Sequence, residues 1–79
     1  MDIIERATRA GQAACTAFRG RHQGRIPNLT TDHGALDLIW PTAWVLLQQQ
    51  GAAADSEAAC YTAFSDGYFD LAPAVYSAE

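Results

Sequence analysis

Residues 36–50 read Leu-Asp-Leu-Ile-Trp-Pro-Thr-Ala-Trp-Val-Leu-Leu-Gln-Gln-Gln, and this stretch is the strongest indication of the fold because it holds both tryptophans and most of the large aliphatic side chains. On a helical wheel, most of its large side chains share or border one face: Leu36, Ile39, Trp40, Ala43, Trp44, Leu46 and Leu47. Leu38 and Val45 fall on the opposite side. A helix that is apolar on both sides has to be buried on both sides. We therefore expect this stretch to form the central helix of a small all-α domain.

The whole chain is short and rich in alanine. Its 79 residues suit a single domain. Alanine favours helix because it gives up no side-chain entropy there. Long alternating runs of Val, Ile and Thr, which would predict a sheet, do not occur. These features predict an all-α, single-domain bundle of four to five short helices around the Trp-rich helix.

Capping and helix-breaking residues set the expected boundaries. They place helices at about 3–19, 32–39, 41–50, 55–65 and 70–77, with a long loop at 20–31. Asp2 is the expected N-cap of the first helix, and Gly20 and Gly67 are expected to end the first and fourth. Gly11 lies inside the first helix, where we expect it to let a neighbour such as a tryptophan approach closely.

Pro41 requires an explanation, because proline inside a helix removes one hydrogen bond and clashes with the preceding turn. Either one helix ends near Ile39 and a second begins at Pro41, or a single helix is kinked there. We favour the break, because the residue before a proline disfavours the α conformation.

Charge is divided unevenly along the chain. The formal net charge is −4, there is no lysine, and all five arginines lie within the first 25 residues. After Arg25 the chain has no Lys or Arg, and its seven acidic residues are Asp32, Asp37, Asp55, Glu57, Asp66, Asp70 and Glu79. Such a surface repels nucleic acid and attracts basic protein surfaces. We expect a protein partner with a basic surface, and no direct binding of nucleic acid.

The chain shows no targeting or membrane signal. Its first residues, Met-Asp-Ile-Ile-Glu-Arg, do not resemble a signal peptide, and no apolar run reaches the ~20 residues of a bilayer span. We expect a cytoplasmic protein that is a monomer or a homodimer. In that reducing compartment Cys15 and Cys60 are expected to be free, buried thiols. A disulfide between Cys15 and Cys60 is kept as the alternative, on the condition that their helices are neighbours.

The candidate metal ligands are Cys15, Cys60, His22 and His33. The same residues are the candidates for a cysteine nucleophile with a histidine base. Zinc sites usually place two ligands two to four residues apart, and here no pair is that close. A reactive thiolate favours a helix N-terminus or adjacent positive charge, whereas both cysteines are expected in the middle of helices. We therefore expect no catalytic residue, no cofactor and no metal, and keep a small metal or thiol protein as an alternative.

A partner-binding surface is the remaining prediction. Residues 66–70 read Asp-Gly-Tyr-Phe-Asp, an aromatic pair flanked by acids, which suits an interface if one ring is exposed. Arginine is also common at interface hot spots. The candidate partner-binding residues are Asp55, Glu57, Asp66, Tyr68, Phe69, Asp70, Arg21 and Arg25.

In size and charge the whole chain resembles phage-encoded anti-defence proteins such as anti-CRISPR proteins. The resemblance implies a small, non-catalytic inhibitor in the host cytosol that blocks a basic, nucleic-acid-binding surface of a defence complex. The alternative is a self-associating structural or assembly subunit, because residues 36–47 are apolar on two sides.

Overall fold

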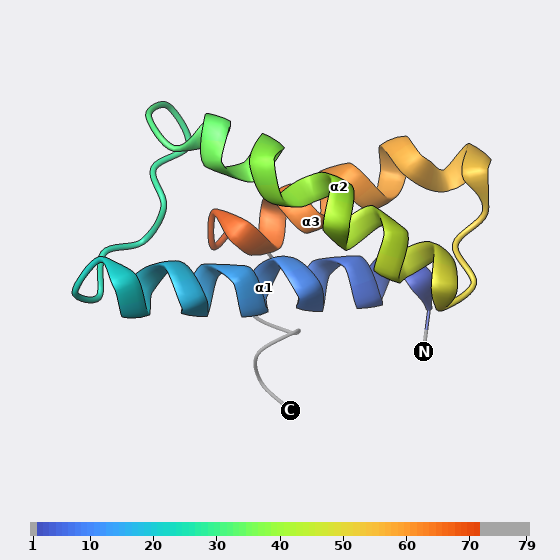
Figure 1. Cartoon of the computed structure of the whole chain (residues 1–79), viewed down its shortest axis with the longest axis horizontal. Helices are drawn as coiled ribbons and strands as arrows, with labels where there is room; N and C mark the ends of the chain where they lie inside the picture. The colour runs from blue at the N-terminus through green and yellow to red at the C-terminus, as the bar shows by residue number, and fades with distance from the viewer. Residues whose placement is uncertain (1, 72–79) are drawn as a thin grey trace.

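The computed structural model describes residues 2–71 and contains three α-helices. They are α1 (Ile3–Arg21), α2 (His33–Gln49) and α3 (Glu57–Tyr68), with a short 3-10 turn, η1 (Ala54–Ser56), before α3. Figure 1 shows α1 along one side of the molecule, with α2 and α3 beyond it. The described residues contain no strand, so the all-α class is confirmed, but four to five helices is wrong. The helix expected at 70–77 lies almost wholly outside the described residues.

The closest helix contact joins α1 and α3, and two glycines allow it. A Cβ added at Gly11 would lie 2.9 Å from the carbonyl carbon of Phe64 and 2.9 Å from the amide nitrogen of Tyr68. A Cβ added at Gly67 would lie 2.9 Å from the amide nitrogen of Gln12. Side chains do not fit at such distances, so the two backbones are in direct contact. Gly11 therefore faces a helix backbone and not a tryptophan, and Gly67 lies inside α3 instead of ending it.

The N-terminal half of α1 follows its sequence closely. The Asp2 side chain accepts a hydrogen bond from the Ile4 amide at 3.2 Å, which confirms the expected cap. Ala7 of this half is fully buried. Thr8 is also buried, because α3 crosses above it. Its hydroxyl remains paired by donating to the Ile4 carbonyl.

The first loop was expected at residues 20–31, but α1 ends only at Arg21 and α2 starts at His33, so the loop covers residues 22–32. α1 continues through Gly20 to Arg21, and the chain leaves the helix where Gln23 and Gly24 adopt positive φ angles. The Gly24 amide donates to the Arg19 carbonyl at 2.8 Å, a hydrogen bond typical of a helix C-terminus. α2 ends at Gln49, close to the expected end at residue 50, and Gly51 follows with a φ of +110°.

α2 runs through Pro41 as one helix, so the predicted break is wrong. Two conditions make the proline tolerable. Pro41 is exposed, so water can reach the carbonyl group left without its helical partner. The residues on either side also belong to one apolar face: Leu36 and Leu47 are both buried, and they hold the two halves of the helix against the other helices.

We expect Pro41→Ala to raise the free energy of unfolding by about 1–2 kcal/mol, because alanine restores a helical hydrogen bond and removes a steric clash. The exposed proline ring contributes little burial to offset this gain. Urea unfolding followed by circular dichroism measures the change. A loss of stability would indicate that the core requires a bend that proline imposes on α2.

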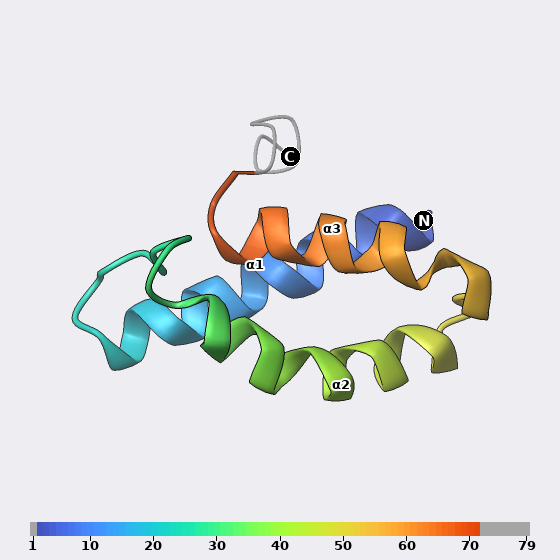
Figure 2. The same cartoon turned by 90° about the horizontal axis from the view of Figure 1, so that it is seen from above.

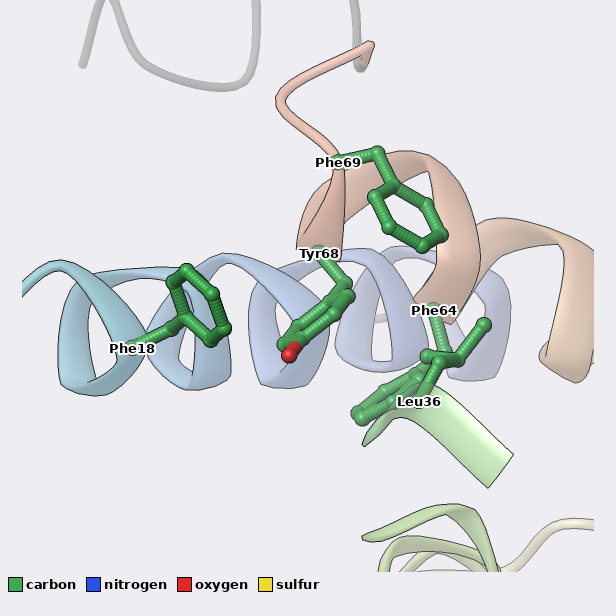
Figure 3. Close-up of a cluster of buried hydrophobic side chains, with 5 residues drawn as sticks. All are labelled: Phe18, Leu36, Phe64, Tyr68 and Phe69. Atoms are coloured by element: carbon green, nitrogen blue, oxygen red, sulfur yellow. The ribbon is translucent and has the colours of Figure 1, made fainter. Parts of the chain in front are cut away.

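Aromatic side chains fill the core between the helices. Its main cluster contains Phe18 from α1, Leu36 from α2, Phe64 and Tyr68 from α3, and Phe69 directly after α3 (Figure 3). The rings of Phe18 and Tyr68 meet edge to face, with centroids 6.0 Å apart. Such aromatic packing gives a small domain much buried area from few residues.

A second core cluster lies toward the N-terminus of α1. It consists of Ala7, Leu47, Cys60 and Ala63. Trp40 packs against both clusters and against the Tyr61 ring, with centroids 5.2 Å apart. The tryptophan of α2 therefore joins the two halves of the core.

α2 is not the central helix that its composition predicts. It lies on one side of the α1–α3 pair (Figure 2). Its second apolar side is left uncovered, because Leu38 is 82% exposed and Val45 is 51% exposed. Leu46, expected on or beside the first face, is also 51% exposed. Trp40 and Trp44 are half-buried. α2 is therefore apolar on two sides but is covered by the other helices on only one of them.

Candidate functional site

An open groove lies between α1 and α2. Its volume is about 740 Å³, and its lining is mainly apolar. It exists because α1 packs closely on α3 but makes few contacts with α2. Phe64 of α3 lies at its inner side. Grooves of this size are large enough to hold a ligand or a segment of a partner protein.

Small side chains form the α1 wall of the groove. Ala10, Ala13, Ala14 and Ala17 all line it. Their spacing of three and four residues places them on one stripe of the helix. Because the stripe carries only methyl groups, whatever enters the groove can come close to the α1 backbone.

Larger side chains form the α2 wall. Leu38, Ile39, Ala43 and Leu46 line this side together with Thr42. Leu38 and Leu46 are the exposed large apolar side chains of this wall, so they are the ones that a bound partner would cover.

Three arginines border the groove. Arg6 and Arg21 lie toward its two ends on α1, with Arg9 between them. Arg6 Nη1 donates to Gln50 Oε1 at 3.3 Å, and Arg9 Nη2 lies 3.7 Å from Glu5 Oε2. Arg21 makes no ion pair within residues 2–71. No carboxylate of the described residues lines the groove, so its border is positive in a chain whose net charge is −4.

The predicted aromatic anchor does not face solvent. Tyr68 is 1% exposed and Phe69 is 4% exposed, since both rings belong to the main core cluster. Burial raises the pKa of the Tyr68 phenol. The condition set for an interface at residues 66–70, one exposed ring, is therefore not met in this structure.

The predicted acidic residues are spread along α3 and are not brought together. Asp55 and Glu57 are exposed around the start of the helix. Asp66 is half-buried near its end, and Asp70 is exposed after it with a φ of +61°. None of the four makes an ion pair within the part of the chain that the structure describes. They are separate acidic side chains around α3 and not a cluster with defined geometry.

The two predicted arginines have different surroundings. Arg21 borders the groove, whereas Arg25 stabilises the loop before α2. The Arg25 guanidinium donates to Asp32 Oδ2 at 3.0 Å and lies 5.0 Å from the centre of the Phe18 ring. Arg25 is therefore occupied by contacts within the chain, and Arg21 is available to a partner.

Asp32 stands at the N-cap position of α2, but its side chain bonds to the loop instead of the helix. The Asn28 amide donates to Asp32 Oδ2 at 2.7 Å, and this bond, followed by the Arg25 hydrogen bond, lowers the pKa of Asp32 below its ordinary 3.8. A lowered folded-state pKa stabilises the loop above the ordinary pKa, and the stabilisation is lost as the pH falls through the folded-state pKa.

We therefore expect the turn at Asn28 to loosen when the pH falls below about 3.8, the ordinary value for Asp32. The Asn28 amide signal in nuclear magnetic resonance (NMR) spectra should shift across this range, and its hydrogen exchange should accelerate relative to that of helix amides. Asp32→Asn should abolish this acid-dependent step. A step of equal size in the variant would assign the transition to other groups.

The two cysteines are free and buried, as predicted. The pKa of the Cys15 thiol is raised, mainly by burial and secondarily by the Asp70 carboxylate, while Arg19 opposes the shift. A raised pKa disfavours the reactive thiolate. Cys60 Sγ lies 3.8 Å from Ser56 Oγ. Within residues 2–71, no group of three or more His, Cys, Asp or Glu side chains is placed to hold a metal ion.

Apart from Arg21, the sequence did not identify the groove residues as a site. The available signal was the second apolar side of α2, which the sequence interpretation assigned to the core. The alanines of α1 gave no signal, because an alanine stripe is equally suited to close packing against another helix. Among the described residues, no helix combines the length and apolar character needed to cross a bilayer.

No family model matches the chain, and no curated protein and no solved structure shows significant similarity to it.

Proposed function

We propose that this chain is a non-catalytic binding protein that inhibits or masks a protein partner, and that the groove between α1 and α2 is its main binding surface. The observation that supports this proposal is the exposure of Leu38, Val45 and Leu46 along one helix, beside an apolar groove. Soluble proteins rarely leave contiguous apolar surface open unless a partner covers it.

The proposal is tested by comparing three immobilised forms of the protein. The groove variant Leu38→Gln/Leu46→Gln changes exposed positions, so its helix content should match that of the wild type. The control Ala58→Gln/Thr62→Gln changes two exposed positions of α3. We expect at least one protein of a bacterial lysate to be held by the wild type and the control and to be released by the groove variant. Identical captured sets for all three forms would contradict the proposal.

A more specific form of the proposal is an anti-defence inhibitor that blocks a basic, nucleic-acid-binding surface. It is supported by the separation of charge: Asp55, Glu57, Asp66 and Asp70 carry negative charge around α3 and make no ion pair within residues 2–71. Complementary charge accelerates the encounter of two proteins. This form uses these four acidic residues, since the arginine border of the groove would repel a basic partner.

Plaque counts on bacteria with an active defence system test the anti-defence form. We expect expression of the chain to raise the efficiency of plaquing, and neutralisation of the four acids to reverse the gain. If the neutralised protein acts as strongly as the wild type while the groove variant fails, the groove and not the four acids carries the inhibition.

Self-association is the alternative that the same exposed leucines support. A dimer formed by two grooves face to face would bury apolar area, but its two-fold symmetry would also bring together the arginines of both copies. Light scattering after size exclusion distinguishes the two cases. A dimer that dissociates in the Leu38→Gln/Leu46→Gln variant would favour the assembly subunit over the masking protein.

A further inference from the structure

We infer that the occupant of the groove is an amphipathic α-helix with acidic flanks, supplied by a partner of different sequence. This inference rests on the proposed function, because it takes the groove as the binding surface. It adds the secondary structure and the charge of the segment that binds there.

The shape of the groove suits a helix. Along α1 its lining extends from Arg6 to Arg21, which corresponds to about 22 Å at ~1.5 Å per residue. A helix of about four turns has this length. The alanine stripe allows the backbone of such a helix to approach α1, because interaxial distance depends on the side chains at the contact.

The apolar lining sets the pattern of the bound helix. Leu38 and Leu46 project from α2 two turns apart, and Ala10, Ala14 and Ala17 face them from α1. A helix lying between these walls would contact both with residues spaced i, i+3 or i+4, and i+7. It would complete a four-helix arrangement in which the second side of α2 is finally covered.

The charge at the border selects an acidic helix. The lining contains Arg6, Arg9 and Arg21 and, within the described residues, no carboxylate. Arginine pairs with carboxylates through two parallel hydrogen bonds, which gives both direction and strength. Since Arg6 and Arg21 lie near opposite ends of the groove, the flanks of the bound helix should carry Asp or Glu near both of its ends.

A second copy of this chain does not supply such a helix among its described elements. α3 carries the acids Glu57 and Asp66 near its two ends, but the exposed residues between them, Ala58, Ala59 and Thr62, are small and offer no large apolar side chain to the groove. The exposed side of α2 has the leucines but borders on the arginines of its own groove. Charge complementarity therefore favours a different chain as the partner.

The experiment uses the full chain and two synthetic helical peptides of about 14 residues, held helical by side-chain lactam bridges. Both carry leucine at i, i+3 and i+7. One has glutamate on its flanks, and its twin has lysine at the same positions. Binding is measured by fluorescence anisotropy, and its location by NMR shifts of the groove alanines and of Leu38 and Leu46.

We expect the glutamate peptide to bind at least about tenfold more tightly than the lysine peptide and to shift the groove signals. Arg6→Gln and Arg21→Gln should each weaken the glutamate peptide about threefold, and added salt should weaken it further. Arg19→Gln is the matched control: this exposed arginine of α1 does not line the groove, so its loss should leave affinity unchanged.

Several outcomes would overturn the inference. Equal affinity for both peptides with shifts in the groove would reject the acidic helix but leave the groove as the binding surface. Groove shifts that grow with protein concentration alone would assign the groove to a second copy of the chain. Decanoate is titrated in parallel, and stronger groove shifts with decanoate than with the glutamate peptide would assign the groove to an acyl anion. Absence of groove shifts with either peptide would reject a helical occupant, and the capture experiment would then judge the proposed function separately.

Discussion

Gly67→Ala is expected to lower the free energy of unfolding by about 3 kcal/mol, although alanine is the better helix former. The added Cβ would overlap the carbonyl oxygen of Thr8 and lie 2.9 Å from the amide nitrogen of Gln12. These are backbone atoms of α1, which cannot turn aside as a flexible side chain can. The two helices would have to separate, and the aromatic cluster between them would lose contacts.

Gly20→Ala is the matched control for this prediction. Gly20 is also helical, but nothing lies within 4 Å of a Cβ placed there. Only the helix preference remains, so this variant should gain up to ~1 kcal/mol. Urea unfolding of the two variants should therefore give changes of opposite sign. If Gly67→Ala were also stabilising, α1 and α3 would not cross with their backbones in contact.

Leu36→Ala is expected to cost about 3 kcal/mol. Leu36 is fully buried in the main core cluster, so its truncation loses apolar burial and leaves a cavity beside Phe64 and Tyr68. In a domain of this size such a loss is a large fraction of the total stability. Thermal or urea unfolding should show a clearly lowered midpoint.

Leu38→Ala tests the same change of residue two positions along α2. Leu38 is 82% exposed, so its truncation should change stability by less than about 0.5 kcal/mol. The helix preference changes equally in both variants, so the difference between them measures burial alone. Equal losses in the two variants would mean that the Leu38 side of α2 is covered in solution, and would support self-association.

The groove arises because α1 lies closer to α3 than to α2. Gly11 and Gly67 bring α1 and α3 together until their backbones touch. α2 meets the same pair through the large rings of Trp40 and Phe64, whose centroids lie 5.4 Å apart. Because interaxial distance depends on the side chains at the contact, α2 is held off from α1. The alanines of α1 are too small to fill the space that remains.

The candidate site was the least predictable part of the molecule. Tyr68 and Phe69 lie in a stretch whose composition suits an exposed interface, yet both rings are in the core. Leu38 and Leu46 lie in a stretch whose composition suits the core, yet both are exposed. Composition records how apolar a segment is, but the exposure of each side chain depends on which helices approach it and how closely.

Local sequence signals were enough to predict the helical class, the start of α1 at its Asp2 cap, the end of α2 just before Gly51 and the division of charge. Each of these follows from residues within one or two turns of each other, or from simple counting. Packing between the helices sets three further features: α2 continues through Pro41, α1 and α3 form the closest pair, and a groove bordered by arginines stays open. These depend on contacts between residues distant along the chain, such as Gly11 with Gly67, where a missing Cβ on each helix sets a separation that no local pattern records.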